Sequence, residues 1–130
     1  MYEVKVMDNL FIADSLNNEF FCPAKNLHGA TYVIDLIVSS NQLSSMNVVI
    51  DIGLASKLLK ECINKYNYKN LDEIESLKGV ITTTEFLAYQ LTNDFIKKLI
   101  KEETNISKIY SIKMVLNESH VASASYKKII

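Results

Sequence analysis

Few side chains in this sequence can carry nucleophilic, acid–base or metal chemistry. Its 130 residues include two cysteines, Cys22 and Cys62, and two histidines, His28 and His120. The cysteines are too few for a disulfide framework, and no C-x-x-C pair indicates a zinc ribbon. Cys62 falls on the apolar stripe of a predicted helix, so we expect it in the core. The sequence contains no Gly-rich phosphate loop and no G-x-S-x-G or H-E-x-x-H motif.

The charged residues exclude several classes of partner. Fourteen basic and fifteen acidic residues give a net charge of −1 at pH 7, which provides no electrostatic case for binding nucleic acid or an anionic membrane. All the basic residues are lysines, so no guanidinium is available for bidentate binding of phosphate, carboxylate or guanine. We therefore expect neither nucleic acid nor membrane as a partner.

The length of the chain fits one domain that spans residues 1–130. Apolar residues make up 48% of it, which is enough for a packed core without disulfides or metal. Residues 1–6 alternate in polarity, unlike a signal peptide, and the apolar runs are too short to span a membrane. We expect a cytoplasmic protein.

The hydrophobic pattern predicts strands near both ends of the chain and two helices between them. The predicted strands are Tyr2–Val6 with Leu10–Ala13, Thr31–Ser39, Tyr110–Leu116 and Val121–Ile130. In Thr31–Ser39 both the odd-numbered and the even-numbered residues are largely apolar. Because these two sets point to opposite faces of a strand, we expect the strand to be buried on both faces. The first helix opens at Asp51 or Ser56. The second opens at Thr82 and Glu85, which have capping-box spacing, and fades near residues 104–105.

The resulting element order is ββααββ, an α+β arrangement in which two helices lie on one face of a four-stranded antiparallel sheet. Two helices can cover only one face, and an open sheet also has two edges that need protection. Self-association with closed symmetry is the simplest way to cover them. We therefore expect a homo-oligomer.

Five local stretches follow one another along nearly the whole chain. They are Phe11–Ser15, Cys22–Tyr32, Met46–Gly53 with Asn67–Leu71, Thr83–Glu85, and Glu118–Tyr126. Together with the element order, they resemble the 6-pyruvoyl-tetrahydropterin synthase / 6-carboxytetrahydropterin synthase family of the tunnelling fold. The resemblance implies a homohexamer of two trimers, in which each trimer closes its sheets into a barrel. It also implies binding sites for a pterin-like small molecule between subunits.

The family resemblance also implies a zinc ion held by three histidines, one ending an F-x-A-x-H stretch and two in H-G-H. In this sequence the first position is Ser15, and the H-G-H reads His28-Gly29-Ala30. A catalytic zinc needs about three protein ligands, so His28 alone is insufficient and we expect no cofactor. His120 lies next to the pterin-binding segment, but its spacing does not support a role as a substitute ligand.

The acid–base groups implied by the family are altered as well. Cys22 keeps the family-like spacing of six residues before His28, and it is the candidate catalytic cysteine. The Asp-His pair that would activate it aligns with Asn67 and Tyr68. An amide cannot take a proton, and a phenol titrates about three units above an imidazole. Without that relay Cys22 is an ordinary thiol, and it is equally readable as a loop cysteine without a catalytic role.

The pterin-recognition residues implied by the resemblance are better preserved. Glu118 aligns with the glutamate that pairs with the amino and ring N–H groups of the pterin. Thr83 and Glu85 match the stretch beside the same pocket. The alternative for Thr83 and Glu85 is a plain helix cap, and for Glu118 a solvated surface carboxylate.

Three functions remain open at this point. The first is an active zinc lyase that acts on dihydroneopterin triphosphate. The second, which we prefer, is a protein that binds a pterin or a similar purine-like heterocycle and has lost the lyase reaction, or runs metal-free chemistry. Dihydroneopterin aldolase, which has a similar layout, is the precedent for metal-free chemistry, and Lys69 is then the acid–base candidate. The third is a structural subunit without catalysis.

Overall fold

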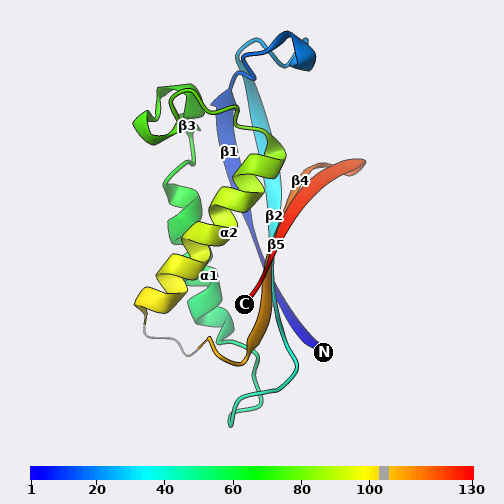
Figure 1. Cartoon of the computed structure of the whole chain (residues 1–130), viewed down its shortest axis with the longest axis vertical. Helices are drawn as coiled ribbons and strands as arrows, with labels where there is room; N and C mark the ends of the chain where they lie inside the picture. The colour runs from blue at the N-terminus through cyan, green and yellow to red at the C-terminus, as the bar shows by residue number, and fades with distance from the viewer. Residues whose placement is uncertain (103–105) are drawn as a thin grey trace.

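A computed structural model describes residues 1–102 and 106–130 of the chain. Its strands and helices are β1 (Tyr2–Asp14), β2 (His28–Ser40), α1 (Ile52–Asn64), β3 (Lys69–Asn70), α2 (Thr84–Lys101), β4 (Ile109–Ser119) and β5 (Ala122–Ile129). The predicted α+β class and the two helices on one face of the sheet are confirmed (Figure 1). The predicted fading of the second helix at residues 104–105 lies outside the described residues.

The sheet has five strands in the order β3-β1-β2-β4-β5, where the sequence predicts four. The four predicted strands pair with one another antiparallel. The additional strand, β3, runs parallel to β1 and pairs only at Ile12↔Lys69 and Ala13↔Asn70. Two residues are too short to show a period of two, so hydrophobic patterning could not reveal this strand.

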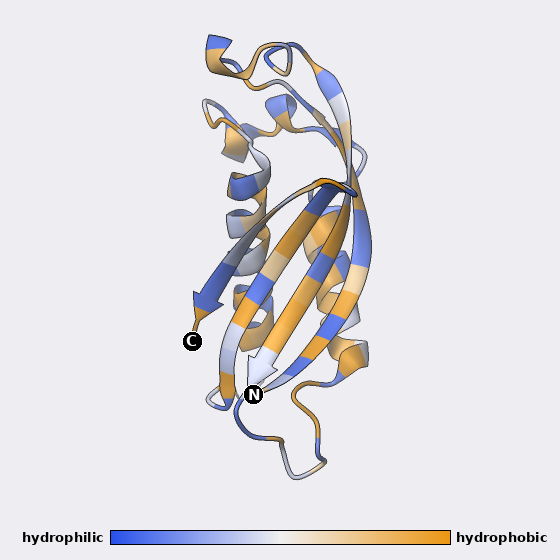
Figure 2. Cartoon of the chain, turned by 90° about the vertical axis from the view of Figure 1, so that its right-hand side faces the viewer, coloured by the Kyte–Doolittle hydropathy of each residue, from blue (hydrophilic) through white to orange (hydrophobic). Residues whose placement is uncertain are grey.

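Within one chain only one face of β2 is deeply buried, so the chain alone does not provide the expected burial on both faces. Tyr32, Ile34, Leu36 and Val38 are buried, whereas Val33 between them is 38% exposed. The alternation arises because successive side chains of a strand point to opposite faces and both helices pack on the same face. Figure 2 looks onto the uncovered face, with α1 and α2 behind the sheet.

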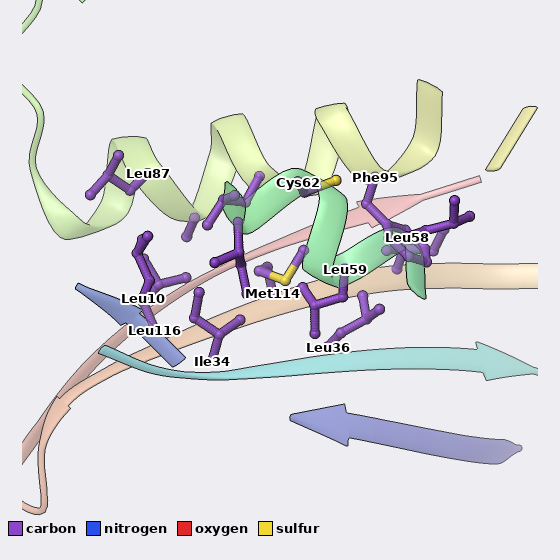
Figure 3. Packing of buried hydrophobic residues seen from close by; sticks show 14 of the residues in the cluster. Leu10, Ile34, Leu36, Leu58, Leu59, Cys62, Leu87, Phe95, Met114 and Leu116 are labelled. Carbon is purple, nitrogen blue, oxygen red and sulfur yellow. The ribbon is translucent and has the colours of Figure 1, made fainter. Parts of the chain in front are cut away.

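The core lies between this sheet and the two helices. Figure 3 shows side chains from both helices interdigitating with side chains from the inner face of the sheet. The labelled residues are Leu10, Ile34, Leu36, Met114 and Leu116 of the sheet, Leu58, Leu59 and Cys62 of α1, and Leu87 and Phe95 of α2. Burial raises the pKa of the Cys62 thiol to about 12, as expected for a core cysteine. Each large side chain in this cluster contributes about 1.5–3 kcal/mol by leaving water.

Both helices begin at a residue whose side chain accepts a backbone hydrogen bond. Asp51 caps α1 by accepting from the N–H of Gly53 at 2.9 Å. Thr83, not Thr82, caps α2, and its Oγ1 accepts from the N–H of Phe86 at 3.1 Å. The predicted capping box is therefore wrong by one residue, because Thr82 turns inward instead. Within the described residues, neither helix is long and apolar enough to cross a membrane.

Candidate functional site

A group of polar side chains lies where β1 ends and β2 begins, at the upper end of the sheet in Figure 1. The strand register sets Asp14 directly opposite His28. The Asp14 carboxylate is almost completely buried, and its Oδ1 lies 3.4 Å from His28 Nε2. Thr82, just before α2, donates from its hydroxyl to Asp14 Oδ2 at 2.7 Å. Three separate segments thus meet at one buried carboxylate.

Glu118, Thr83 and Glu85 surround this group. Glu118 is exposed at the irregularity between Asn117 and Ser119, where the β4–β5 register shifts. Thr83 and Glu85 lie at the start of α2. The adjacent Thr84 hydroxyl is 3.2 Å from the hydroxyl of Tyr32, a buried residue of β2. The end of the sheet and the start of α2 therefore share one polar environment.

Negative charge is concentrated in this environment. Burial raises the pKa of Asp14 above its ordinary value, and the nearby charges of Asp72 and Glu118 raise it further. The hydrogen bond from Thr82 and the charge of His28 act in the opposite direction. Burial also raises the pKa of Tyr32, with added contributions from Asp14, Glu118 and Glu85. Two carboxylates thus act on Asp14 and three on Tyr32, and Glu118 acts on both.

The three positions that the family resemblance aligns with zinc ligands hold one imidazole, one hydroxyl and one methyl. The Ser15 hydroxyl donates to Asp72 Oδ2 at 2.6 Å, and the Ser15 N–H donates to Asp72 Oδ1 at 3.2 Å. Ala30 pairs with Ile12 in the sheet and offers no donor atom for a metal. His28 Nδ1 lies 2.8 Å from the carbonyl oxygen of Asn26. Because a carbonyl only accepts, this contact assigns the proton of the neutral ring to Nδ1.

His120 does not join this group as a ligand. It lies in the exposed turn between β4 and β5. Among residues 1–102 and 106–130, no set of three or more histidine, cysteine, aspartate or glutamate side chains is arranged to hold a metal ion.

Within one chain, the candidate relay residues lie apart from the Asp14 group. Asn67 Oδ1 accepts from the N–H of Phe11 at 2.9 Å, and the N–H of Tyr68 donates to the Phe11 carbonyl at 2.6 Å. The Tyr68 ring stacks on Phe11 with centroids 5.3 Å apart and remains 79% exposed. Phe11 alternates with the buried Leu10 and Ile12, so this stack lies away from the helix-covered face.

Cys22 and Lys69 are likewise separate from the Asp14 group. Cys22 is an exposed free thiol that follows the short 3-10 turn Glu19–Phe21. Lys69 Nζ donates to the carbonyl oxygen of Lys65 at 3.0 Å, in the loop after α1. The structure therefore gathers His28, Glu118, Thr83 and Glu85 into one region, and it does not bring Cys22, Asn67, Tyr68 or Lys69 to them within a single chain.

Sequence reasoning missed Asp14, Thr82 and Tyr32 as members of the site. Asp14 could have been found from the sequence, because the alternation of β1 puts its carboxylate on the same face of the strand as Leu10 and Ile12. A charged residue that continues an apolar stripe must be paired when it is buried. The involvement of Thr82 has no comparable signal, since it depends on how the loop before α2 packs.

A pocket of about 390 Å³ opens beside Ser15 and Asp72. The loop before α2 forms its other side, with Lys78 and the backbone of residues 79–81. Lys78 Nζ donates to the Asp72 carbonyl oxygen at 3.0 Å. The lining includes Ser15, the residue after Asp14, but not Asp14 or His28.

Comparison with known proteins identifies the family. A family model described as 6-pyruvoyl tetrahydropterin synthase matches residues 3–128. The chain belongs to this family. A 6-carboxy-5,6,7,8-tetrahydropterin synthase of Aquifex aeolicus is 28% identical over 122 residues, covering 79% of this chain and 75% of that protein. A 6-pyruvoyl tetrahydrobiopterin synthase of Dictyostelium discoideum is 30% identical over 74 residues, covering 55% of each chain.

The fold of the family is also recovered in solved structures. The 6-pyruvoyl tetrahydropterin synthase of Caenorhabditis elegans superposes with a TM-score of 0.78 at 20% identity, over 98% of this chain and 95% of that chain. At this identity the likeness establishes the fold alone. The predicted tunnelling fold is confirmed by it, and the roles of individual residues remain predictions.

Proposed function

We propose that this protein binds a pterin, or a similar purine-like heterocycle, at the end of the sheet, and that it no longer catalyses the zinc-dependent lyase reaction of its family. Glu118 is the proposed anchor, because a carboxylate can accept hydrogen bonds from two neighbouring N–H groups of a planar ring. Thr83 and Glu85 at the start of α2 flank the same ligand. Family membership and the clustering of these residues around Tyr32 support the assignment.

The other two aligned ligand positions support the loss of zinc. His28 directs Nδ1 to the Asn26 carbonyl and its Nε2 lies 3.4 Å from Asp14 Oδ1, so His28 offers one ligand nitrogen at most. Ser15 is occupied by Asp72, and Ala30 has no donor. These side chains do not fit a centre that needs about three protein ligands, and no step of the proposed function depends on a metal.

The loss of the proton relay has a similar basis. Asn67 uses its carbonyl oxygen to satisfy a backbone N–H of β1, and an amide cannot act as a general base. The exposed Cys22 has no basic group bonded to it among the contacts described. We therefore assign Asn67 a structural role, and Cys22 no catalytic one.

The assembly we propose is the homohexamer implied by the family, formed in the cytoplasm by copies of one domain spanning residues 1–130. One face of the sheet is not covered by helices in one chain (Figure 2), and β5 is an edge strand. Exposed strand edges favour pairing with another chain, and closed symmetric rings satisfy them.

One observation favours retained synthase activity as a second candidate. The 3.4 Å between Asp14 Oδ1 and His28 Nε2 is also close to the separation of two ligands on one tetrahedral metal with bonds of about 2 Å. This candidate needs a third ligand, which the described residues do not supply.

Equilibrium binding of neopterin to the purified protein tests the proposal, with the fluorescence of the pterin ring as the signal. We expect saturable binding with one site per chain. Absence of binding to both neopterin and its dihydro form would overturn the proposal and favour a structural subunit.

A further inference from the structure

We infer that Tyr68 provides a flat aromatic surface on which the bound heterocycle stacks, and that the chain supplying this ring is the neighbour of the chain supplying Glu118. The inference rests on the proposed pterin site and the proposed ring of chains, and it adds a positioning residue to them. It is based on the backbone and exposure of Tyr68, on its contact with Phe11, and on where the sheet places Tyr68 and Glu118.

The backbone of Tyr68 is held in a conformation that tyrosine rarely adopts. Its φ of 60° lies in the left-handed region, which is unfavourable for a residue with a Cβ. The N–H of Tyr68 donates to the Phe11 carbonyl at 2.6 Å, and Asn67 Oδ1 accepts from the Phe11 N–H at 2.9 Å. Strained residues that their surroundings hold in this way cluster at ligand sites. The direction in which the side chain leaves the backbone is thus fixed before any ligand arrives.

The Tyr68 ring lies flat on one neighbour and is otherwise open. Its plane differs from that of the Phe11 ring by 10°, the centroids are 5.3 Å apart, and Tyr68 is 79% exposed. An offset parallel pair can accept a third ring on its open side, and exposed aromatic side chains bind nucleic-acid bases in this manner. The other aromatic pairs that the described residues form are tilted or edge-on, namely Phe20–Phe21, Phe86–Tyr89 and Tyr89–Tyr126.

A planar heterocycle is the ligand that such a surface fits. The Glu118 carboxylate can accept from the amino and ring N–H groups at the edge of the heterocycle. This contact at the edge leaves both faces of the ring without a partner, although the faces hold most of its area. Stacking on Tyr68 supplies the contact that recognition of the edge lacks.

Tyr68 and Glu118 lie at the same end of the sheet but at opposite edges. Tyr68 directly precedes β3, which pairs with the last part of β1 at one edge. Glu118 lies near the end of β4, where the chain turns into β5 at the other edge. The register ties the two levels together, since the β2 partners of Phe11 and Asn117 are two residues apart. Figure 1 shows β3 and the tip of the β4–β5 hairpin on opposite sides of the upper half of the molecule.

A closed ring of chains brings these two edges together. In cyclic symmetry every copy points the same way along the axis, so one edge of each sheet meets the opposite edge of the next sheet. A ring closed through the sheets therefore sets the β3 edge of one chain beside the β5 edge of its neighbour, at the same end. Tyr68 and Glu118, which one chain keeps apart, then border one space between two chains.

Titration of neopterin with the wild-type protein and two Tyr68 variants tests the inference, with the fluorescence of the pterin ring as the signal. Asparagine suits a left-handed backbone, so Tyr68→Asn removes the ring and preserves the turn. We expect its affinity for neopterin to fall at least about fivefold. Tyr68→Phe keeps the ring and should bind like the wild type. Tyr2→Leu removes an exposed tyrosine at the other end of β1 and should leave the affinity unchanged.

The outcomes separate this inference from the proposed function. Unchanged affinity in Tyr68→Asn would overturn the inference and leave the proposed function intact. Failure of the wild type to bind neopterin would overturn both. If Tyr68→Asn does not fold, Tyr68→Gly takes its place, because glycine also suits this backbone.

Two further measurements separate stacking from a contact between chains. Gel filtration should give the same assembly for Tyr68→Asn as for the wild type, and loss of the assembly together with binding would make Tyr68 an interface residue and overturn the inference. Co-expression of Tyr68→Asn with Glu118→Gln should restore about a quarter of the sites, because some neighbouring chains then supply one intact residue each. No recovery in the mixed assembly would contradict a site shared between chains.

Discussion

The end of the sheet at Asp14 and the edge of β1 at Asn67 differ in the contacts that their polar residues make. At both, a position that the family resemblance assigns to chemistry holds a residue that makes a local hydrogen bond: Ser15 to Asp72, and Asn67 to the backbone of Phe11. The buried ionisable group beside Asn67 is Tyr66, whose hydroxyl donates to Asp94 of α2 at 3.0 Å. The end of the sheet keeps a buried carboxylate beside an imidazole. Buried, mutually interacting titratable groups are typical of functional sites, which supports our proposal that the first region is the ligand site and that Asn67 in the second has a structural role.

The largest expected effect is on ligand binding at the end of the sheet. Glu118→Gln replaces an anionic acceptor by an amide, so one N–H of the heterocycle is left poorly paired. We expect neopterin affinity to fall by about 1–3 kcal/mol, measured by fluorescence titration. Glu75→Gln, an exposed carboxylate in a separate turn, is the control. An unchanged affinity in Glu118→Gln would remove Glu118 from the site.

A smaller effect is expected at the edge of β1, on stability. Asn67→Ala leaves the N–H of Phe11 without its acceptor, so the free energy of unfolding should fall by about 1–2 kcal/mol, measured in urea. Asn67→Asp keeps an acceptor oxygen and should recover most of the loss. If Asn67→Ala instead left stability intact, the structural role assigned to this residue would be wrong.

The smallest effect is a gain in stability from a substitution in the ligand site. Because burial raises the pKa of Asp14, the folded state favours the protonated carboxyl. The stability from this group is complete below the unfolded-chain pKa of about 3.9 and is lost as the pH rises through the folded pKa. Asp14→Asn, which can still accept from Thr82, should therefore raise the free energy of unfolding by about 1 kcal/mol at pH 7.

The pH dependence of this gain provides its control. The difference between Asp14→Asn and the wild type should diminish in acid, where the wild-type carboxyl also becomes neutral. Urea unfolding at several pH values measures it. A loss of stability at pH 7 would mean that the Asp14–His28 ion pair outweighs the cost of burying the carboxylate, and the contrast between the two regions would weaken.

The two regions also differ in how well the sequence predicts them. Periodicity identified both helices and four strands because each repeats its pattern over many residues. The two-residue strand β3 and the exact cap of α2 depend on single local contacts, which no pattern of this kind encodes. The family motifs located His28 and Glu118. They did not indicate Asp14, since its importance comes from the strand register that sets it opposite His28.

The central claim is that His28, with Ser15 and Ala30 at the other two aligned positions, does not hold a zinc ion. Zinc content of the purified protein, measured by elemental analysis after incubation with excess zinc and desalting, tests it most directly. We predict far less than one zinc per chain and no change in His28→Ala. Near-stoichiometric zinc that disappears in His28→Ala would contradict the account.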